Sequence, residues 1–230
     1  MAISLGEIET WIRAAQFDPR GAFYCTPDDN VPDLPGGIQA RTVVLIGTIG
    51  ARFWPTFLAA RLSLGDEPNP LDAYSNRVIS NLAKEFKAFA VFPFGGPPWH
   101  PFQRWAQRAD VVFSSPIGPL IHPQYGLWHA YRGALIFAEE VPGVTAPVEG
   151  SSPCESCVDK PCLKTCPAGA FSTQGYDVPG CISHLLDAKG QACMKTGCLA
   201  RQACPVGVEY QYPSDHAQFH MDAFVKNHSK

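Results

Sequence analysis

Eight of the nine cysteines in this 230-residue chain lie between positions 154 and 204, in two groups of four. The first group has the spacing Cys-x2-Cys-x4-Cys-x3-Cys-Pro, and the second has Cys-x11-Cys-x4-Cys-x5-Cys-Pro. The members are Cys154, Cys157, Cys162 and Cys166, followed by Cys181, Cys193, Cys198 and Cys204. Long apolar runs are rare around them, so we expect bound metal to replace a large hydrophobic core in this segment.

The Cys-Pro ending of each group is typical of proteins with two [4Fe–4S] clusters, where the cysteine before proline binds the other group's cluster. This exchange predicts one cluster on Cys154, Cys157, Cys162 and Cys204. It predicts a second cluster on Cys166, Cys181, Cys193 and Cys198. Longer inserts than usual precede three of the cysteines, so the ligands of the second cluster are less well defined than those of the first, and the loss of one cluster or a three-iron form stays open. Two zinc sites are the alternative, but zinc sites more often have paired CxxC units and this chain has one.

The remaining composition limits the classes of function. The chain has 18 Lys and Arg against 21 Asp and Glu, a net charge of −3 that argues against a general nucleic-acid binder. It shows neither a secretory signal nor an apolar run near the roughly 18 residues that cross a bilayer. Clustered thiols without a signal predict a cytoplasmic protein with no membrane association. Cys25 stands apart, and we expect it to be a small buried hydrophobe.

The first part of the chain alternates between helical and extended patterns, which predicts an α+β domain over residues 1–145. The expected helices span residues 5–16, 72–88 with Asp72 as N-cap, and 102–109 with Trp105 inward. The expected strands are the apolar run 42–48 and the segments 90–94 and 132–138. Residues 141–153 have the composition of a linker. The cysteine-rich domain is expected over residues 146–230, with a ferredoxin-like fold.

Two segments of the cysteine-rich region carry a family resemblance. Pro161–Ala170, which contains Cys-Pro-Ala-Gly-Ala, and Gly180–His184, which contains Cys-Ile-Ser, resemble the ferredoxin unit of epoxyqueuosine reductases and reductive dehalogenases. The resemblance implies two [4Fe–4S] clusters that feed a cobalamin. This chain is much shorter than those reductases and has no match to their C-terminal helical repeats or their catalytic acid. The transfer-RNA substrate is therefore not carried over.

A second resemblance lies in Ile121–Gly133, which is similar to the His-Pro-x-x-Gly-x-Trp-x-x-x-Arg-Gly segment of CblC-type cobalamin-processing proteins. It implies a nitroreductase-like α+β fold that binds cobalamin and removes its upper ligand reductively. The candidate cofactor-binding residues are His122, Tyr125, Trp128 and Arg132. For His122 the alternative is a turn histidine bonded to the backbone. For the aromatic residues it is core packing, and for Arg132 a surface ion pair.

Together these patterns favour a redox protein in which an N-terminal domain binds a corrinoid, a flavin or a small substrate, and the cysteine-rich domain supplies electrons from a donor protein. No catalytic residue is assigned. The first alternative is a plain electron carrier without a second cofactor. The second is a zinc-binding interaction module.

Overall fold

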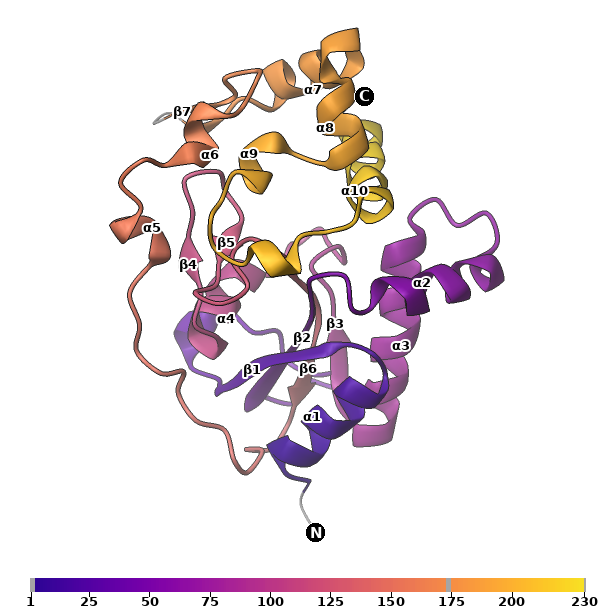
Figure 1. Ribbon diagram of the computed structural model, residues 1–230. Helices are drawn as coiled ribbons and strands as arrows, with labels where there is room; N and C mark the ends of the chain where they lie inside the picture. The colour runs from indigo at the N-terminus through magenta and orange to yellow at the C-terminus, as the bar shows by residue number, and fades with distance from the viewer. Residues whose placement is uncertain (1–2, 173–174, 230) are drawn as a thin grey trace. The chain divides into compact units, whose positions relative to one another are not determined.

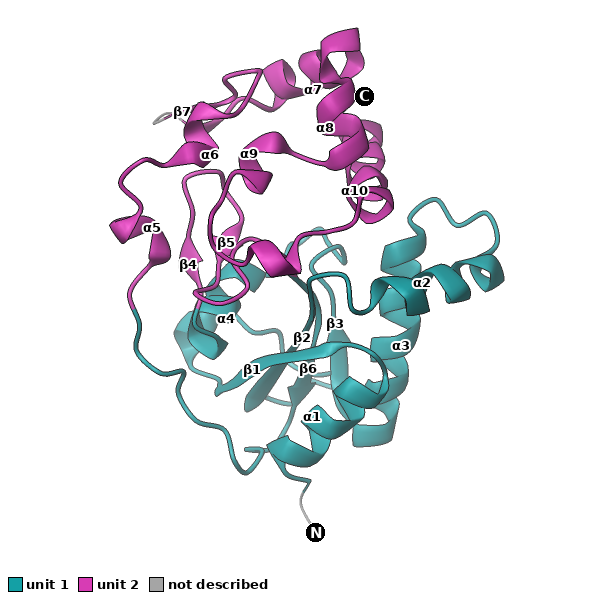
Figure 2. Ribbon diagram, in the orientation of Figure 1, with its two compact units in different colours: residues 1–111, 130–150 teal, residues 112–129, 151–230 magenta. Residues whose placement is uncertain are grey.

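The computed structural model describes residues 3–172 and 175–229 (Figure 1). The chain forms two compact units, which Figure 2 draws in separate colours. The first consists of residues 1–111 and 130–150, and the second of residues 112–129 and 151–230. Residues 112–129 therefore group with the cysteine-rich segment, whereas the sequence led us to expect a single boundary between residues 145 and 146.

A four-stranded sheet with the strand order β1-β2-β6-β3 forms the centre of the first unit. Its strands are β1 (Asp18–Tyr24), β2 (Thr42–Ile49), β6 (His129–Phe137) and β3 (Phe89–Val91). The helices are α1 (Leu5–Ala14), α2 (Trp54–Arg61), α3 (Pro70–Phe86) and α4 (Phe102–Ala109), with 3-10 turns η1 (Pro27–Asp29) and η2 (Leu62–Leu64). Every residue of β2 is buried, so both faces of this strand are covered, as its continuous apolar run predicts.

The helices of the first unit begin and end for identifiable local reasons. Ser4 and Glu7 form a capping box at the start of α1, in which each side chain binds the other residue's backbone amide. The prediction that Asp72 caps α3 is wrong, because α3 starts at Pro70 with Asn69 as N-cap. Proline suits the first helical position, since its missing N–H has no partner there in any helix. Asp72 lies in the first turn instead.

Apart from the helix α10, the second unit is made of short elements. The hairpins pair β4 (Phe113–Ser114) with β5 (Leu120–Ile121) and β7 (Phe171–Ser172) with β8 (Gly175–Tyr176). The helices are α5 (Pro153–Ser156), α6 (Pro161–Lys164), α7 (Val178–Leu186), α8 (Gln191–Thr196), α9 (Leu199–Gln202) and α10 (Ser214–His228), with 3-10 turns η3 (Ala188–Gly190) and η4 (Val208–Tyr210). Helix α10 packs against α7 and α8, and α6 packs against α9.

Two small apolar clusters stabilise the second unit, and each contains cysteines. The first is built on Ile117, Ile121, Leu127 and Cys204. The second is built on Ile182, Leu185 and Cys193, and Phe224 of α10 packs against it. Among the residues described, no helix combines the length and apolarity needed to cross a bilayer.

Candidate functional site

A cavity in the second unit is lined by four cysteines that are distant in sequence. Cys154, Cys157 and Cys162 come from the start of the cysteine-rich segment, and Cys204 comes from its end. The other lining residues are mostly apolar: Pro116, Ile121, Pro153, Lys160, Pro161, Pro205 and Val206. These four cysteines make up the first predicted set, including the exchanged Cys204. Residues of the segment 112–129 form part of the wall.

Local backbone geometry positions the cysteines of this first set. The Ser152 hydroxyl caps α5 by accepting the Cys154 amide, and Pro153 occupies the first turn. Lys160 has a left-handed backbone, which turns the chain so that Pro161 can start α6 with Cys162 in its first turn. Each short helix therefore begins at a proline next to a cysteine.

The second set contains the remaining clustered cysteines, Cys166, Cys181, Cys193 and Cys198. Cys181 lies in the first half of α7, Cys193 lies in α8, and Cys198 is the N-cap of α9. Their thiols are close enough to act on one another electrostatically, and Cys166 acts on each of the other three. The Ala170 amide donates a hydrogen bond to the Cys166 sulfur at 3.4 Å. In space, Cys166 thus lies near Cys181, Cys193 and Cys198, whereas Cys204 lies near the cysteines of the first group.

Burial dominates the electrostatics of these thiols. It raises the pKa of the thiols of Cys154, Cys162, Cys181, Cys193, Cys198 and Cys204 above the usual value. Thiolates of the same set add to this rise in pKa for all six. Cysteine binds metal as the thiolate. A cation bound in the site would therefore favour the thiolate form and lower the pKa that burial raises.

The side chains of the described residues form no preassembled site for a single metal ion. A tetrahedral zinc site with 2.3 Å bonds needs sulfur atoms about 3.8 Å apart. No group of three or more histidine, cysteine, aspartate or glutamate side chains within residues 3–172 and 175–229 converges in a way that could hold one ion.

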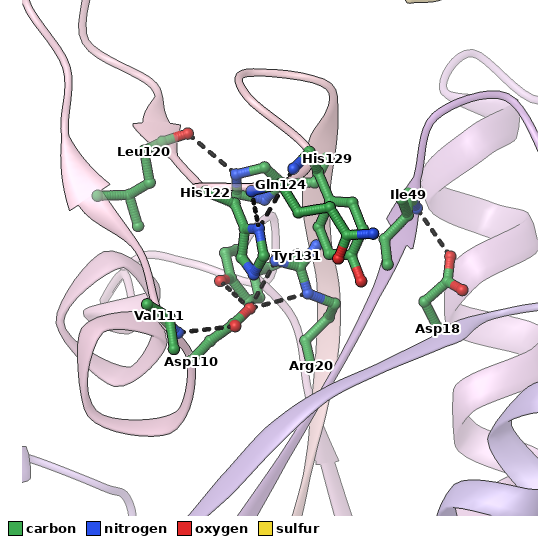
Figure 3. Close-up of polar contacts among 11 residues, drawn as sticks. Asp18, Arg20, Ile49, Asp110, Val111, Leu120, His122, Gln124, His129 and Tyr131 are labelled. Carbon is green, nitrogen blue, oxygen red and sulfur yellow. Dashed lines mark hydrogen bonds and ion pairs between the residues drawn. The ribbon is translucent and has the colours of Figure 1, made fainter. Parts of the chain in front are cut away.

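Of the four predicted cofactor residues, His122 and Tyr125 lie together in a turn of the second unit. His122 forms an isolated bridge with Gly126, and its Nδ1 accepts hydrogen bonds from the amides of Gln124 and Tyr125 at 3.0 and 3.2 Å (Figure 3). The neutral ring therefore carries its proton on Nε2. The rings of His122 and Tyr125 are stacked, with centroids 4.2 Å apart. These contacts are those of a turn histidine.

Trp128 is also in the second unit and is buried in its interior. The guanidinium of Arg201 lies 4.5 Å from the Trp128 ring centroid and 4.7 Å from that of Tyr212. Nε and Nη2 of the same arginine donate hydrogen bonds to the Leu127 carbonyl oxygen. Trp128 thus joins the 122–129 turn to the C-terminal part of this unit, as a core aromatic would.

Arg132 lies elsewhere, in the first unit. It donates hydrogen bonds to the Asp72 carboxylate at 2.5 Å and to the Ser75 hydroxyl at 3.1 Å, and its guanidinium is 5.3 Å from the Phe94 ring centroid. The structure therefore pairs Arg132 with α3 and does not group it with His122, Tyr125 and Trp128.

Sequence reasoning missed a polar network in the first unit. Oδ2 of Asp110 accepts hydrogen bonds from Nε and Nη2 of Arg20, at 2.9 and 2.5 Å, and from the Tyr131 hydroxyl at 2.9 Å (Figure 3). The side chain of Arg20 is 2% exposed, so the ion pair is desolvated. Burial, followed by the Asp110 carboxylate, raises the pKa of Tyr131. Because these residues are up to 111 positions apart, no local pattern could have identified them.

The first unit also contains a polar cavity of about 400 Å³ at the start of α3. Its lining residues are Glu67, Pro68, Asn69, Asp72, Ala73, Asn76, Arg77 and Phe94. Asp72, the partner of Arg132, is among them.

No family model and no curated protein matches the sequence. Solved structures do match. The B12-trafficking protein CblC of C. elegans, a homologue of human MMACHC, has a TM-score of 0.54 at 13% identity, over 94% of this chain and 90% of that one. A selenomethionine-labelled epoxyqueuosine reductase has a TM-score of 0.50 at 17% identity, over 91% of this chain and 68% of that one. At such identities the likeness concerns the fold, and this chain has a mixed α and β fold like those of CblC and epoxyqueuosine reductase.

Proposed function

We propose that this chain is a cytoplasmic iron–sulfur reductase whose two cysteine sets bind two [4Fe–4S] clusters. The observation that carries the proposal is the crossed grouping of the eight cysteines. Cys204 joins the cysteines of the first group, and Cys166 joins those of the second. Two separate four-cysteine modules would not need this exchange, whereas the two-cluster arrangement requires it.

The residues around the cysteines fit such clusters. Cys154, Cys157, Cys162 and Cys204 line one mostly apolar cavity, so all four could contribute ligands to the same multi-iron group. Deprotonated, these mostly half-buried thiols would form a strongly anionic set whose charge a cationic iron–sulfur core would offset.

When bound, the clusters supply one-electron transfer at low potential. The protein's own groups would partly shield the sulfur atoms from water and would tune the cluster potentials through hydrogen bonds. The Ala170 amide does this at Cys166, and the Tyr176 hydroxyl does it at Cys181. The electrons would come from a separate donor protein.

The acceptor in this proposal is a corrinoid, with a flavin or another small substrate as alternatives. Support comes from the fold shared with a B12-trafficking protein and from the His-Pro-x-x-Gly-x-Trp pattern of residues 122–128. A plain electron carrier is the second candidate. It is favoured by the structural contacts of the predicted cofactor residues, since His122 holds a turn, Trp128 packs in a core and Arg132 pairs with Asp72.

Anaerobic purification with metal analysis and visible absorption, before and after addition of hydroxocobalamin, tests both candidates. We expect broad brown absorption with about eight iron atoms per chain, the content of two four-iron clusters. A corrinoid spectrum that shifts and co-elutes with the protein would support the reductase. Clusters without a corrinoid shift would leave the carrier. Zinc without iron would overturn both.

A further inference from the structure

Helix α10 carries two histidines whose ring nitrogens meet. His216 and His220 are four residues apart, so they project from the same face of the helix. Their Nε2 atoms are 3.1 Å apart. An imidazole N–H more often donates to a carbonyl or carboxylate oxygen, but here its partner is the nitrogen of a second imidazole.

We propose that His216 and His220 form a binding site for a divalent transition-metal ion of the zinc or nickel class, separate from the cysteine sets. Two histidines at this spacing on one helical face are a recurrent metal-binding pair. Imidazole nitrogen suits borderline ions such as Zn²⁺ and Ni²⁺.

The distance between the nitrogens fits shared coordination. An ion about 2.05 Å from each Nε2, with the nitrogens 3.1 Å apart, would subtend an angle of about 98° at the metal. This lies between the 90° of octahedral sites and the 109° of tetrahedral ones. An ion can therefore take the place of the proton that lies between the two Nε2 atoms, and this proton moves to Nδ1 of the donating ring or to solvent, while the helix itself does not rearrange.

Neighbouring aromatic packing holds the rings in this orientation. Tyr212 stacks on His216 with centroids 3.9 Å apart, and its ring lies 5.5 Å from that of His220. His216 is buried, whereas His220 is partly exposed and provides the side from which an ion can enter. Preoriented ligands lose little rotamer freedom when an ion binds.

Two charged groups act on the pair. The Arg201 guanidinium stacks on the Tyr212 ring and disfavours a cation, while the Asp215 carboxylate next to His216 favours one. Among the described residues no third histidine, cysteine, aspartate or glutamate completes a single-ion site. Water or a small ligand would take the other positions, so the proposed site has the open coordination of an exchangeable metal.

Calorimetric titration of the cluster-loaded protein with NiCl₂ and with ZnCl₂ tests the proposal, using His220→Asn as the variant. The wild type is expected to bind one ion more than His220→Asn, or the same number with at least tenfold higher affinity at one site. His228→Ala is the matched control, because His228 lies on the same helix but bonds to the Phe224 carbonyl oxygen. It should titrate like the wild type.

A residue-specific readout separates binding from misfolding. Diethyl pyrocarbonate should modify His220 more slowly when Ni²⁺ is present, as measured by mass spectrometry of the wild-type protein. Identical titrations of wild type and His220→Asn, with no protection of His220, would overturn the site. Iron content is measured on the same samples, so loss of the clusters and loss of the histidine site give different results.

Discussion

The α-carbon of Gly126 lies directly against the carbonyl oxygen of Val206. A Cβ on Gly126 would stand 1.9 Å from that oxygen, and the residue has a φ of +56°. Val206 lies two positions after Cys204 and lines the same cavity. The turn that contains His122 is therefore pressed against the segment that positions the last cysteine of the first set.

Substituting Gly126 by alanine should damage this contact in two ways, through the backbone clash and through the positive φ. We expect the free energy of unfolding to fall by about 2–4 kcal/mol. Iron should be lost preferentially from the first cysteine set. Urea unfolding and iron analysis of the purified variant measure both effects.

Gly118→Ala is the matched control for this substitution. Gly118 has a φ of +100° in the same 112–129 segment, but nothing lies within 4 Å of its would-be Cβ. It should cost about 1 kcal/mol from backbone strain alone and leave the iron content unchanged. Equal losses in the two variants would show that the contact with Val206 does not matter.

The exchange of cysteines between groups predicts which cluster each substitution removes. Cys166→Ser should abolish the second cluster, although Cys166 belongs to the first group in sequence. Cys204→Ser should abolish the first cluster. Each variant should keep about four of eight iron atoms, and electron paramagnetic resonance of the reduced proteins should show two different remaining signals. Cys25→Ser serves as the control with full iron content. The same remaining signal in both variants would rule out the exchange.

Two substitutions of His122 separate its role in the turn from a role in cofactor binding. In His122→Asn the side-chain oxygen can still accept the amides of Gln124 and Tyr125, because asparagine forms such turns readily. His122→Ala loses this acceptor. If the ring contacts a corrinoid, both variants should weaken hydroxocobalamin binding at unchanged iron content. If His122 only holds the turn, His122→Asn should bind like the wild type. Spectral titration gives the answer.

The ion pair between Arg132 and Asp72 should contribute to the stability of the first unit, because the Arg132 side chain is 13% exposed and that of Asp72 is 34% exposed. A double-mutant cycle with Arg132→Ala and Asp72→Ala should give a coupling energy of about 1 kcal/mol. Arg132→Lys should recover part of it, since lysine cannot bind Asp72 and Ser75 in the same planar geometry. A coupling near zero would return Arg132 to the list of ligand-binding residues.

The thiol of Cys25 should be slow to react at neutral pH. Burial, followed by the Asp29 carboxylate, raises its pKa from 9.0 to about 11, while Arg108 opposes the rise. Since the thiolate is the reactive form, the rate with a disulfide reagent at pH 8 should be about 100-fold below that of a thiol with a pKa of 9.0. The rate should rise about tenfold per pH unit up to about pH 10 and then level off as the pH passes the pKa of about 11. In cluster-loaded protein, Cys25→Ser should remove this reaction. The structure leaves Cys25 half-buried, whereas the sequence led us to expect a buried residue, and a rate at pH 8 equal to that of free cysteine would contradict even this half-buried setting.

Local sequence patterns determined much of the first unit's secondary structure. The continuous apolar run at 42–48 became β2, and the pattern around Trp105 predicted α4 with its observed bounds, Phe102–Ala109. Strand β1 was missed because Asp18, Pro19 and Gly21 are unfavourable in strands. Tertiary contacts allow it, since Asp110 pairs with the buried Arg20, which lies 90 residues away in sequence.

The crossed cysteine sets could be expected from the sequence because the Cys-Pro spacing is a local feature with a fixed geometric consequence. The surroundings of those cysteines could not be predicted from the sequence. Three features depend on the packing of distant segments. Residues 112–129 line the cavity of the first set, Arg132 pairs with α3, and the rings of His216 and His220 meet next to Tyr212. Spacing along the chain indicated which cysteines belong together, and tertiary packing decided what surrounds them, because burial and partner distances arise only when the chain has folded.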